Sequence, residues 1–219
     1  MGLCLKINEQ IYDSKNFGKA NIVKYGYLNY IQGDGASYID TGFSGYRNNY
    51  GDIASQIPSD APKIEITIKK NSTYNEYVVA TRDGRGNMSI QVNPSEVTIS
   101  GKGAIGKFQV NEVEQDINII YGSVKTFVNG KAVKDNTDMS NQYRLNAYSD
   151  NNITLLGGKA NPDTQVFTKN MVKEFKAYEG EKLVLHLRPY RKKDGTVCMI
   201  DEVTKTFHYN AGTGTLIGI

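Results

Sequence analysis

Three acidic side chains recur at alternate positions in Glu112-Val113-Glu114-Gln115-Asp116. In an extended chain, residues two apart point to the same side, so these three carboxylates would share one face. Hydrolysis of a glycosidic bond needs two carboxylates that flank the scissile bond. The segment leads directly into the apolar run that begins at Ile117, and this context favours a solvated edge or loop. We therefore expect no enzymatic activity, with glycoside hydrolysis as the less favoured alternative.

Residues capable of covalent or metal chemistry are few and scattered. The chain contains two histidines, His186 and His208, and two cysteines, Cys4 and Cys198. Neither histidine is paired with a nucleophile in a recognisable motif, and the spacing of the four residues matches no zinc site. We expect the histidines to be packing or surface residues and both thiols to be reduced. No catalytic residue, no metal ligand and no cofactor is predicted.

Aromatic and amide side chains gather in one stretch that contains Tyr143, Asn146, Tyr148 and Asp150. Tyrosine rings stack on the flat faces of sugars, and amide and carboxylate groups form hydrogen bonds with sugar hydroxyls. This stretch is the predicted carbohydrate contact. An ordinary tyrosine-rich loop is the alternative interpretation.

The most basic segment contains Arg188, Arg191, Lys192 and Lys193. Such a run could bind phosphate or an acidic glycan. It immediately precedes the turn sequence Asp194-Gly195, which favours a solvated hairpin or a contact with a neighbouring chain.

These side chains must be positioned by β-structure, because apolar residues alternate with period two through most of the chain. Asn129-Gly130 is the preferred pair for a tight type I′ hairpin turn. The window 171–178 fits both a helical stripe and a strand, and its short length before Gly180 favours a strand. Strands are expected at 63–68, 77–80, 88–92, 97–99, 117–121, 124–128, 131–133, 171–178, 182–188 and 197–200.

Length and composition indicate one large β-rich domain. The 219 residues are 39% hydrophobic and 22% charged, with fifteen Tyr and no Trp. The net charge of +3 is too small to indicate a nucleic-acid partner or an anionic membrane surface. No run of eighteen apolar residues occurs, so no membrane partner is expected.

The first 24 residues differ from the remainder of the chain. Leu3, Leu5 and Ile7 alternate along a short strand-like stretch, and a polar segment follows. We interpret 1–24 as an arm for attachment or oligomer contact, with these three side chains at the interface. The N-terminal sequence lacks the secretory pattern of a charged leader followed by an apolar core. The chain is therefore expected either to be made and used in the cytosol or to be exported as part of something larger.

Three motifs together resemble a known family. They are YIQGDGASYIDTGF at 30–43, VKTFVNGK at 124–131, and a third that runs from FKAY at 175–178 through RPYRKKDG at 188–195 to YNAGTGT at 209–215. In this order and spacing they resemble the concanavalin A-like, laminin G-like jelly-roll domains of bacteriophage and prophage virion proteins. The resemblance covers about residues 25 to 219.

The resemblance implies an all-β, two-sheet antiparallel jelly-roll sandwich at 25–219 with the arm at 1–24. It further implies a non-enzymatic structural or adhesion protein of a virion: a head fibre, a decoration protein or a tail appendage. Such a protein assembles in the host cytoplasm with other virion proteins, forms a homo-oligomer such as a trimer, and contacts cell-surface polysaccharide. A bacterial carbohydrate-binding lectin is the alternative.

Calcium is an open question that the same resemblance raises, because laminin G-like domains often hold this ion. The loops at 135–138 and 149–152 supply the Asp, Asn and backbone oxygens that calcium prefers. Neither loop is densely acidic, and such loops are more often simple turns.

Overall fold

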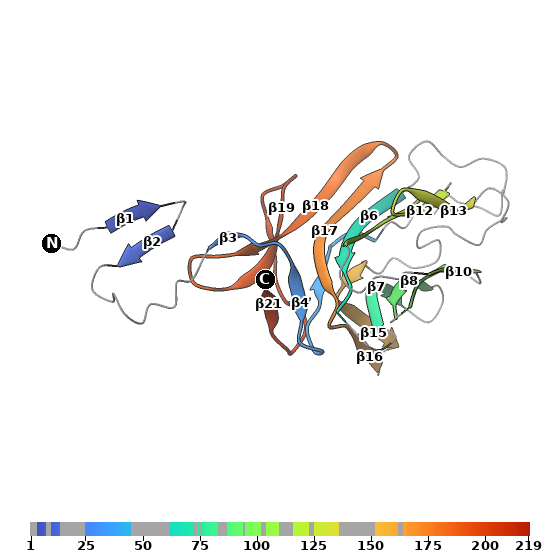
Figure 1. The fold of residues 1–219 in the computed structure, drawn as a ribbon, viewed down its shortest axis with the longest axis horizontal. Helices are drawn as coiled ribbons and strands as arrows, with labels where there is room; N and C mark the ends of the chain where they lie inside the picture. Colours follow the sequence, from blue (N-terminus) through green and yellow to red (C-terminus); the bar gives the residue numbers. More distant parts are fainter. Residues whose placement is uncertain are drawn as a thin grey trace.

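The computed structural model describes residues 4–7, 10–13, 25–44, 62–71, 74, 76–82, 87–93, 95–101, 104–109, 116–122, 125–135, 152–161 and 164–219. Every regular element within these ranges is a β-strand (Figure 1). The described residues therefore contain no helix long and apolar enough to cross a membrane. The strands form an eleven-stranded sheet, a six-stranded sheet and two separate hairpins. This confirms the predicted all-β architecture of two antiparallel sheets.

The eleven-stranded sheet has a centre of four long neighbouring strands: β11 (Asp116–Tyr121), β6 (Pro62–Lys69), β17 (Met171–Glu179) and β18 (Lys182–Arg191). Beyond β11 lie β12 (Lys125–Val128) and β13 (Lys131–Asp135), and beyond β18 lie β19 (Val197–Asp201) and β20 (Phe207–His208). Three short strands complete it: β3 (Gly26–Tyr27) on β18, β4 (Ile31–Gly33) on β17, and β21 (Leu216–Gly218) on β4.

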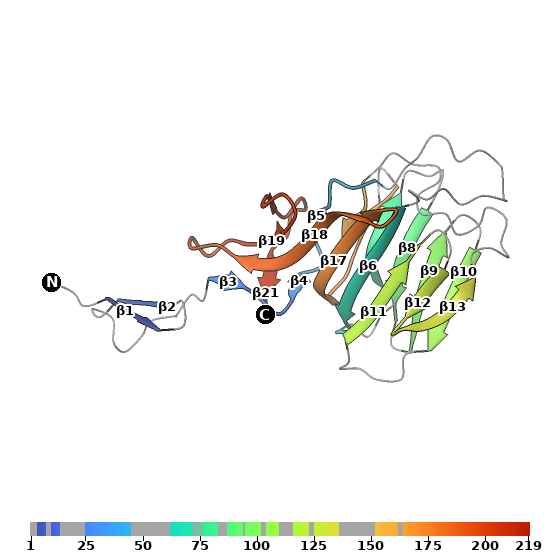
Figure 2. The ribbon, with the colours of Figure 1, turned by 90° about the horizontal axis from the view of Figure 1, so that it is seen from above.

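The six-stranded sheet forms the second layer, behind the large sheet in Figure 2. Its order is β10 (Ala104–Gln109), β9 (Glu96–Gly101), β8 (Asn87–Val92), β7 (Glu76–Arg82), β14 (Thr154–Leu155) and β5 (Ile39–Asp40). The two hairpins pair β1 (Cys4–Ile7) with β2 (Gln10–Asp13), and β15 (Gly157–Asn161) with β16 (Thr164–Phe167).

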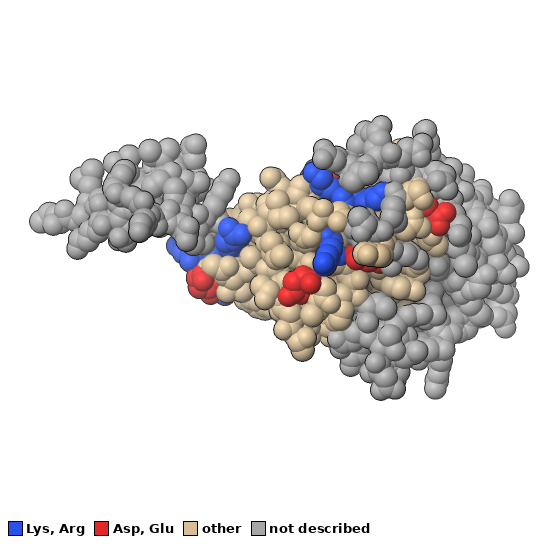
Figure 3. All heavy atoms as spheres, turned by 60° about the horizontal axis from the view of Figure 1, so that its bottom comes forward, with Lys and Arg blue, Asp and Glu red and all other residues tan. Residues whose placement is uncertain are grey.

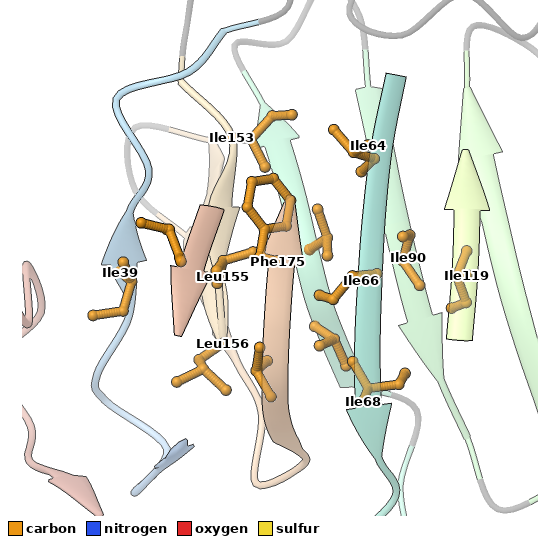
Figure 4. Close-up of a cluster of buried hydrophobic side chains, with 14 of the residues drawn as sticks. Ile39, Ile64, Ile66, Ile68, Ile90, Ile119, Ile153, Leu155, Leu156 and Phe175 are labelled. Carbon is orange, nitrogen blue, oxygen red and sulfur yellow. The ribbon is translucent and has the colours of Figure 1, made fainter. Parts of the chain in front are cut away.

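The core lies between the two sheets and follows the alternation of the sequence. Ile64, Ile66 and Ile68 of β6 are fully buried, whereas the residues between them are only half-buried. Side chains of the second sheet, including Ile90 and Leu155, meet them (Figure 4). Burying an isoleucine side chain stabilises the fold by about 1.5–3 kcal/mol, so this alternation sets which face of β6 points inward.

The predicted strands are present, and their ends differ by a few residues. The ambiguous window at 171–178 is the strand β17. Asn129 and Gly130 both have positive φ, 49° and 74°, as a type I′ turn requires. β18 continues to Arg191, three residues beyond its predicted end. It extends because β3 supplies a new partner, Tyr27 opposite Tyr190, where the pairing with β17 has ended at Leu187.

The first and third sequence motifs pack against each other and join the two ends of the sandwich domain. The Asp34 carboxylate accepts hydrogen bonds from the backbone N–H of Thr215 at 2.6 Å and of Ala36 at 2.9 Å. These bonds, above all the one from Thr215, hold the pKa of Asp34 below its ordinary value. Asn210 makes a parallel link, because its Oδ1 accepts from the backbone N–H of Tyr38 at 3.1 Å. The motifs are therefore structural.

We expect Gly214→Ala to destabilise this junction. A Cβ at Gly214 would lie 2.1 Å from Oδ1 of Asp34, so either the carboxylate or the loop must move. The free energy of unfolding, measured by urea denaturation, should fall by about 1–3 kcal/mol. Thr213→Ala, at an exposed position of the same loop, is the matched control and should change stability little. Equal stability of the two variants would show that the Asp34 contact does not hold the loop.

Candidate functional site

The outer face of the large sheet, which points away from the core, carries the chemistry-bearing side chains. Leu185, Leu187 and Pro189 of β18 are buried, whereas His186, Arg188 and Tyr190 lie on the opposite face. Cross-strand partners share a face, so the register brings side chains from β17, β3, β19 and β20 beside these three. Two groups result, a charged network around His186 and a row of aromatic rings around Tyr190.

The charged network spans β6, β17 and β18. Oε1 of Glu174 lies 2.6 Å from Nε2 of His186, and Oε2 of Glu174 accepts a hydrogen bond from Lys176 at 2.9 Å. Further along β17, the hydroxyl of Tyr178 lies 3.4 Å from Oε2 of Glu65 on β6. His186 is thus the partly buried partner of a carboxylate, in agreement with the expected packing role.

Glu174 is held as a carboxylate. Burial acts to raise its pKa, but the hydrogen bonds from Lys176 and His186 outweigh burial and leave the pKa below its ordinary value. A glycosidase needs a carboxylic acid that keeps its proton near neutral pH, which requires a raised pKa. Glu174 therefore has the wrong electrostatic environment for the proton donor.

Asp116 is the one member of the acidic segment Glu112–Asp116 that lies among the described residues. It begins β11, pairs with Lys173 at 2.6 Å and accepts a hydrogen bond from the hydroxyl of Tyr30 at 2.8 Å. Burial raises its pKa, but these two partners more than compensate and lower the pKa overall. Asp116 therefore joins two strands of the outer face through its ion pair and its bond to Tyr30.

The aromatic row consists of Tyr27, Tyr190, Phe207 and Tyr209, from β3, β18, β20 and the residue after β20. Successive ring centroids are 5.5, 5.7 and 6.3 Å apart. Tyr27, Phe207 and Tyr209 remain 48%, 37% and 47% exposed. Large aromatic side chains are often buried, so a contiguous exposed set is a candidate binding surface.

Two cations lie over these rings. The guanidinium of Arg188 is 4.4 Å from the ring centroid of Tyr27. The ammonium of Lys192 is 5.8 Å from the centroid of Phe207 and 5.4 Å from that of Tyr209. All three distances are within the range of a cation–π contact. Lys192 also donates to the Tyr209 hydroxyl at 3.3 Å, and this bond, with the charge of Asp194, raises the pKa of Lys192.

A small buried residue lets the rings meet across the sheet. Tyr190 and Phe207 belong to strands on either side of β19, about 10 Å apart at ordinary strand spacing, yet their centroids are 5.7 Å apart. Both rings lean over β19, where Cys198 is paired with Tyr190 and is fully buried. Cys198 is a free cysteine, as expected, and burial raises the pKa of its thiol to about 11.

Asp201 sets the turn that leads from β19 to Phe207. Its carboxylate is 1% exposed and accepts from the backbone N–H groups of His186, Val203 and Thr204 at 2.9, 3.0 and 3.1 Å. Burial acts to raise its pKa. The hydroxyl of Thr204 and these backbone donors outweigh burial, so the pKa of Asp201 is lowered.

Acidic and basic side chains are mixed on the surface of the protein. Figure 3 shows one side of the molecule, on which both kinds are interspersed over the described part with uncharged surface between them. Beside the row, Glu202 accepts a hydrogen bond from the hydroxyl of Tyr27 at 2.5 Å and pairs with Lys205 at 2.5 Å. The row is therefore aromatic, with charges at its edges.

The predicted carbohydrate contact, Tyr143, Asn146, Tyr148 and Asp150, lies outside the described residues. The same holds for Glu112, Glu114 and Leu3, and for most of the two loops considered for calcium. Leu5 and Ile7 are in β1, where the backbone pairs Leu5 with Tyr12 of β2. Among the described side chains, no group of three His, Cys, Asp or Glu residues could hold a metal ion.

The basic run from Arg188 to Lys193 was predicted to be a solvated hairpin, and this prediction is correct only in part. Arg191 donates to the carbonyl of Gly218 at 3.1 Å and so fixes β21, whereas Arg188 and Lys192 contact the aromatic row. Lys193 lies 5.6 Å from the ring centroid of Tyr25. No motif in the sequence predicted the aromatic row. The alternate spacing in Tyr25-Gly26-Tyr27 and Phe207-His208-Tyr209 is the signal that could have indicated rings on one face.

Comparison with known proteins places the chain beside two solved structures. No protein-family profile and no curated protein sequence matches it. The mouse laminin alpha1 chain, domains LG4-5, is similar with a TM-score of 0.45 and 11% identity over 72% of this chain, which spans 41% of that fragment. The heptameric SAP-like pentraxin from Limulus polyphemus gives a TM-score of 0.43 and 10% identity over 92% of both chains. Both neighbours are concanavalin A-like jelly rolls, and neither comes from a bacteriophage.

We expect Asp201→Asn to destabilise the protein in a pH-dependent way. At pH 7 the amide cannot accept all the bonds that the carboxylate accepts, and the loss should be about 1.5–3 kcal/mol. The folded-state pKa is lowered, so this stabilisation is complete above the unfolded pKa of about 4 and is lost as the pH falls through the folded value.

The measurement is urea denaturation of both proteins from pH 7 to pH 2.5. Their difference should be constant down to about pH 4 and shrink below it. Glu181→Gln removes a carboxylate whose side chain is 97% exposed and serves as the control with little effect. A difference that is the same at every pH would contradict a stabilising ionised Asp201.

Proposed function

We propose that this chain is a non-enzymatic adhesion or structural protein of a bacteriophage particle, and that the outer face of its large sheet contacts cell-surface carbohydrate. The aromatic row carries the proposal of carbohydrate binding. Four rings on one face, three of them more than a third exposed, offer apolar surface and hydroxyl groups together. Rings of this kind stack on sugar faces, and tyrosine hydroxyls bind sugar hydroxyls.

The virion setting rests on the resemblance of the three sequence motifs to phage virion domains. In this setting the chain is a head fibre, a decoration protein or a tail appendage, bound to other virion proteins and assembled in the host cytoplasm. Residues 1–24, with Leu3, Leu5 and Ile7, form the attachment arm, and the chain is a homo-oligomer such as a trimer.

The electrostatics of the outer face support a binding role over hydrolysis. The carboxylates of Glu174 and Asp116 have lowered pKa values because each is paired with a lysine. Neither can hold the proton that a glycosidase delivers to its leaving group at neutral pH. Glu174 links β17 to β18 through His186, and Asp116 of β11 reaches across β6 to Lys173 of β17, a structural role that a binding surface needs.

We expect Phe207→Ala and Tyr209→Ala to weaken carbohydrate binding. Truncation of a central aromatic contact commonly costs more than 1–2 kcal/mol, which is about a tenfold loss of affinity or more. Binding is measured on an array of bacterial surface polysaccharides, both neutral and acidic, and by titration of the best ligand. Tyr74→Ala is the matched control, because Tyr74 is a 76% exposed tyrosine outside the row.

Full binding by both row variants would contradict this site. Binding by no polysaccharide on the array would contradict the carbohydrate role itself. Release of reducing sugar from a bound polysaccharide, abolished by Glu112→Gln or Glu114→Gln, would show that the protein is a hydrolase instead.

We expect the purified chain to be an oligomer that co-purifies with phage particles through a density gradient. Light scattering after gel filtration gives the mass, and antibody detection across the gradient gives the incorporation. Removal of residues 1–24 should abolish incorporation, because the arm is the proposed attachment. A monomer that enters particles equally well without residues 1–24 would overturn the virion proposal.

A further inference from the structure

We infer that the ligand of the aromatic row is an acidic polysaccharide, a sugar polymer that carries carboxylate or sulfate groups. This inference rests on the proposed carbohydrate-binding function and specifies its ligand class. It follows from the cations that lie beside three of the rings, from the weak ion pair that holds one of these cations, and from the acidic groups beside the row.

Three of the four rings already contact the protein's own cations. Arg188 lies over Tyr27, and Lys192 lies within 6 Å of both Phe207 and Tyr209. An aromatic site for a cationic ligand, such as a quaternary ammonium group, needs these negative ring faces to be available. Here a ligand cation would meet the like charge of Arg188 and Lys192 beside the rings. The row therefore disfavours cations and offers positive charge to an anion.

Lys192 is the cation best placed to receive an anionic group. Its ammonium makes an ion pair with Asp194 at 3.5 Å, and the two side chains are 32% and 59% exposed. Exposed ion pairs of this kind contribute little, so a ligand carboxylate or sulfate can replace Asp194 at small cost. Because the same ammonium contacts Phe207 and Tyr209, the anionic group would be bound where sugar rings stack.

The spacing of the rings suits a polymer of sugars. Centroids follow each other at 5.5 to 6.3 Å, close to the length of one pyranose unit in an extended chain. The interplanar angles of 86°, 48° and 39° tilt each ring relative to the next. Such a row can follow a polymer whose sugar planes rotate from one unit to the next.

Single-stranded nucleic acid, which also combines rings with negative charge, fits less well. Its binding depends on cations that neutralise a phosphate at every nucleotide. The row instead has carboxylates at its edges, Glu202 beside Tyr27 and Asp194 beside Lys192, and the whole chain carries a net charge of only +3. These carboxylates would repel a continuous phosphate backbone more than a polymer whose charges alternate with hydroxyl groups.

The test compares acidic polymers with neutral polymers of the same backbone. One pair is polygalacturonate and its carboxyl-reduced form, and the second is dextran sulfate and dextran. Titration calorimetry at 50 mM and 300 mM NaCl gives the affinities, and poly(dT) is the nucleic-acid comparison. We expect at least one acidic polymer to bind roughly tenfold or more tightly than its neutral partner, and less tightly at high salt.

Lys192→Gln should lower affinity for the acidic polymer roughly five- to tenfold, as loss of one partly exposed charge-assisted contact predicts. It should leave affinity for any neutral polymer nearly unchanged. Lys182→Gln is the matched control, because this exposed lysine lies on the same strand at the end opposite Tyr190. The control should bind like the unaltered protein.

The outcomes separate the inference from the function on which it rests. Equal binding of acidic and neutral polymers, or binding of neutral polysaccharides alone, overturns the inference and leaves the carbohydrate role intact. Tighter binding of poly(dT) than of every polysaccharide overturns the inference in favour of nucleic acid. If no polysaccharide binds, here or on the array, the proposed function fails and the inference fails with it.

Discussion

The register between β6, β17 and β18 is the constraint on which both faces of the large sheet depend. It aligns Ile66 with Phe175 and Phe175 with Leu187, so that apolar residues enter the core together. The same alignment places Lys176 opposite both Glu65 and His186 on the outer face. A shift by one residue would exchange the two faces, which means that burial of the core also fixes the site.

Polar side chains, some exposed and some buried, hold the irregular parts around this register. Asp34 and Asn210 join the two ends of the sandwich domain through backbone N–H groups, and Asp201 fixes the turn before Phe207. In each case a side-chain oxygen accepts hydrogen bonds from backbone N–H groups of a loop. The outer face thus combines strands placed by apolar burial with loops placed by Asx side chains.

Most of the fold could be predicted from the sequence, but less of the candidate site could. Alternation such as Ile64, Ile66 and Ile68 predicts strands directly, and Asn129-Gly130 predicts its turn, because both depend on neighbouring residues. The aromatic row depends on Tyr27 and Phe207, 180 positions apart, which meet Tyr190 from opposite sides. The order of the strands in the sheet brings these rings together, and no local sequence pattern indicates that order. The motif at 30–43 was recognisable, but its structural role with Thr215 required the pairing to be seen.

The burial of Cys198 on β19, the strand between Tyr190 and Phe207, has a consequence for how the site can be observed. A thiol reacts as the thiolate. Cys198 therefore reacts slowly for two reasons: its pKa is about 11, and it has no exposed surface. The two-residue strand β20 lies at the edge of the sheet and carries Phe207. Local opening of that edge would uncover the sulfur. The rate at which a thiol reagent modifies Cys198 therefore reports the local unfolding equilibrium at the aromatic row, separately from global unfolding.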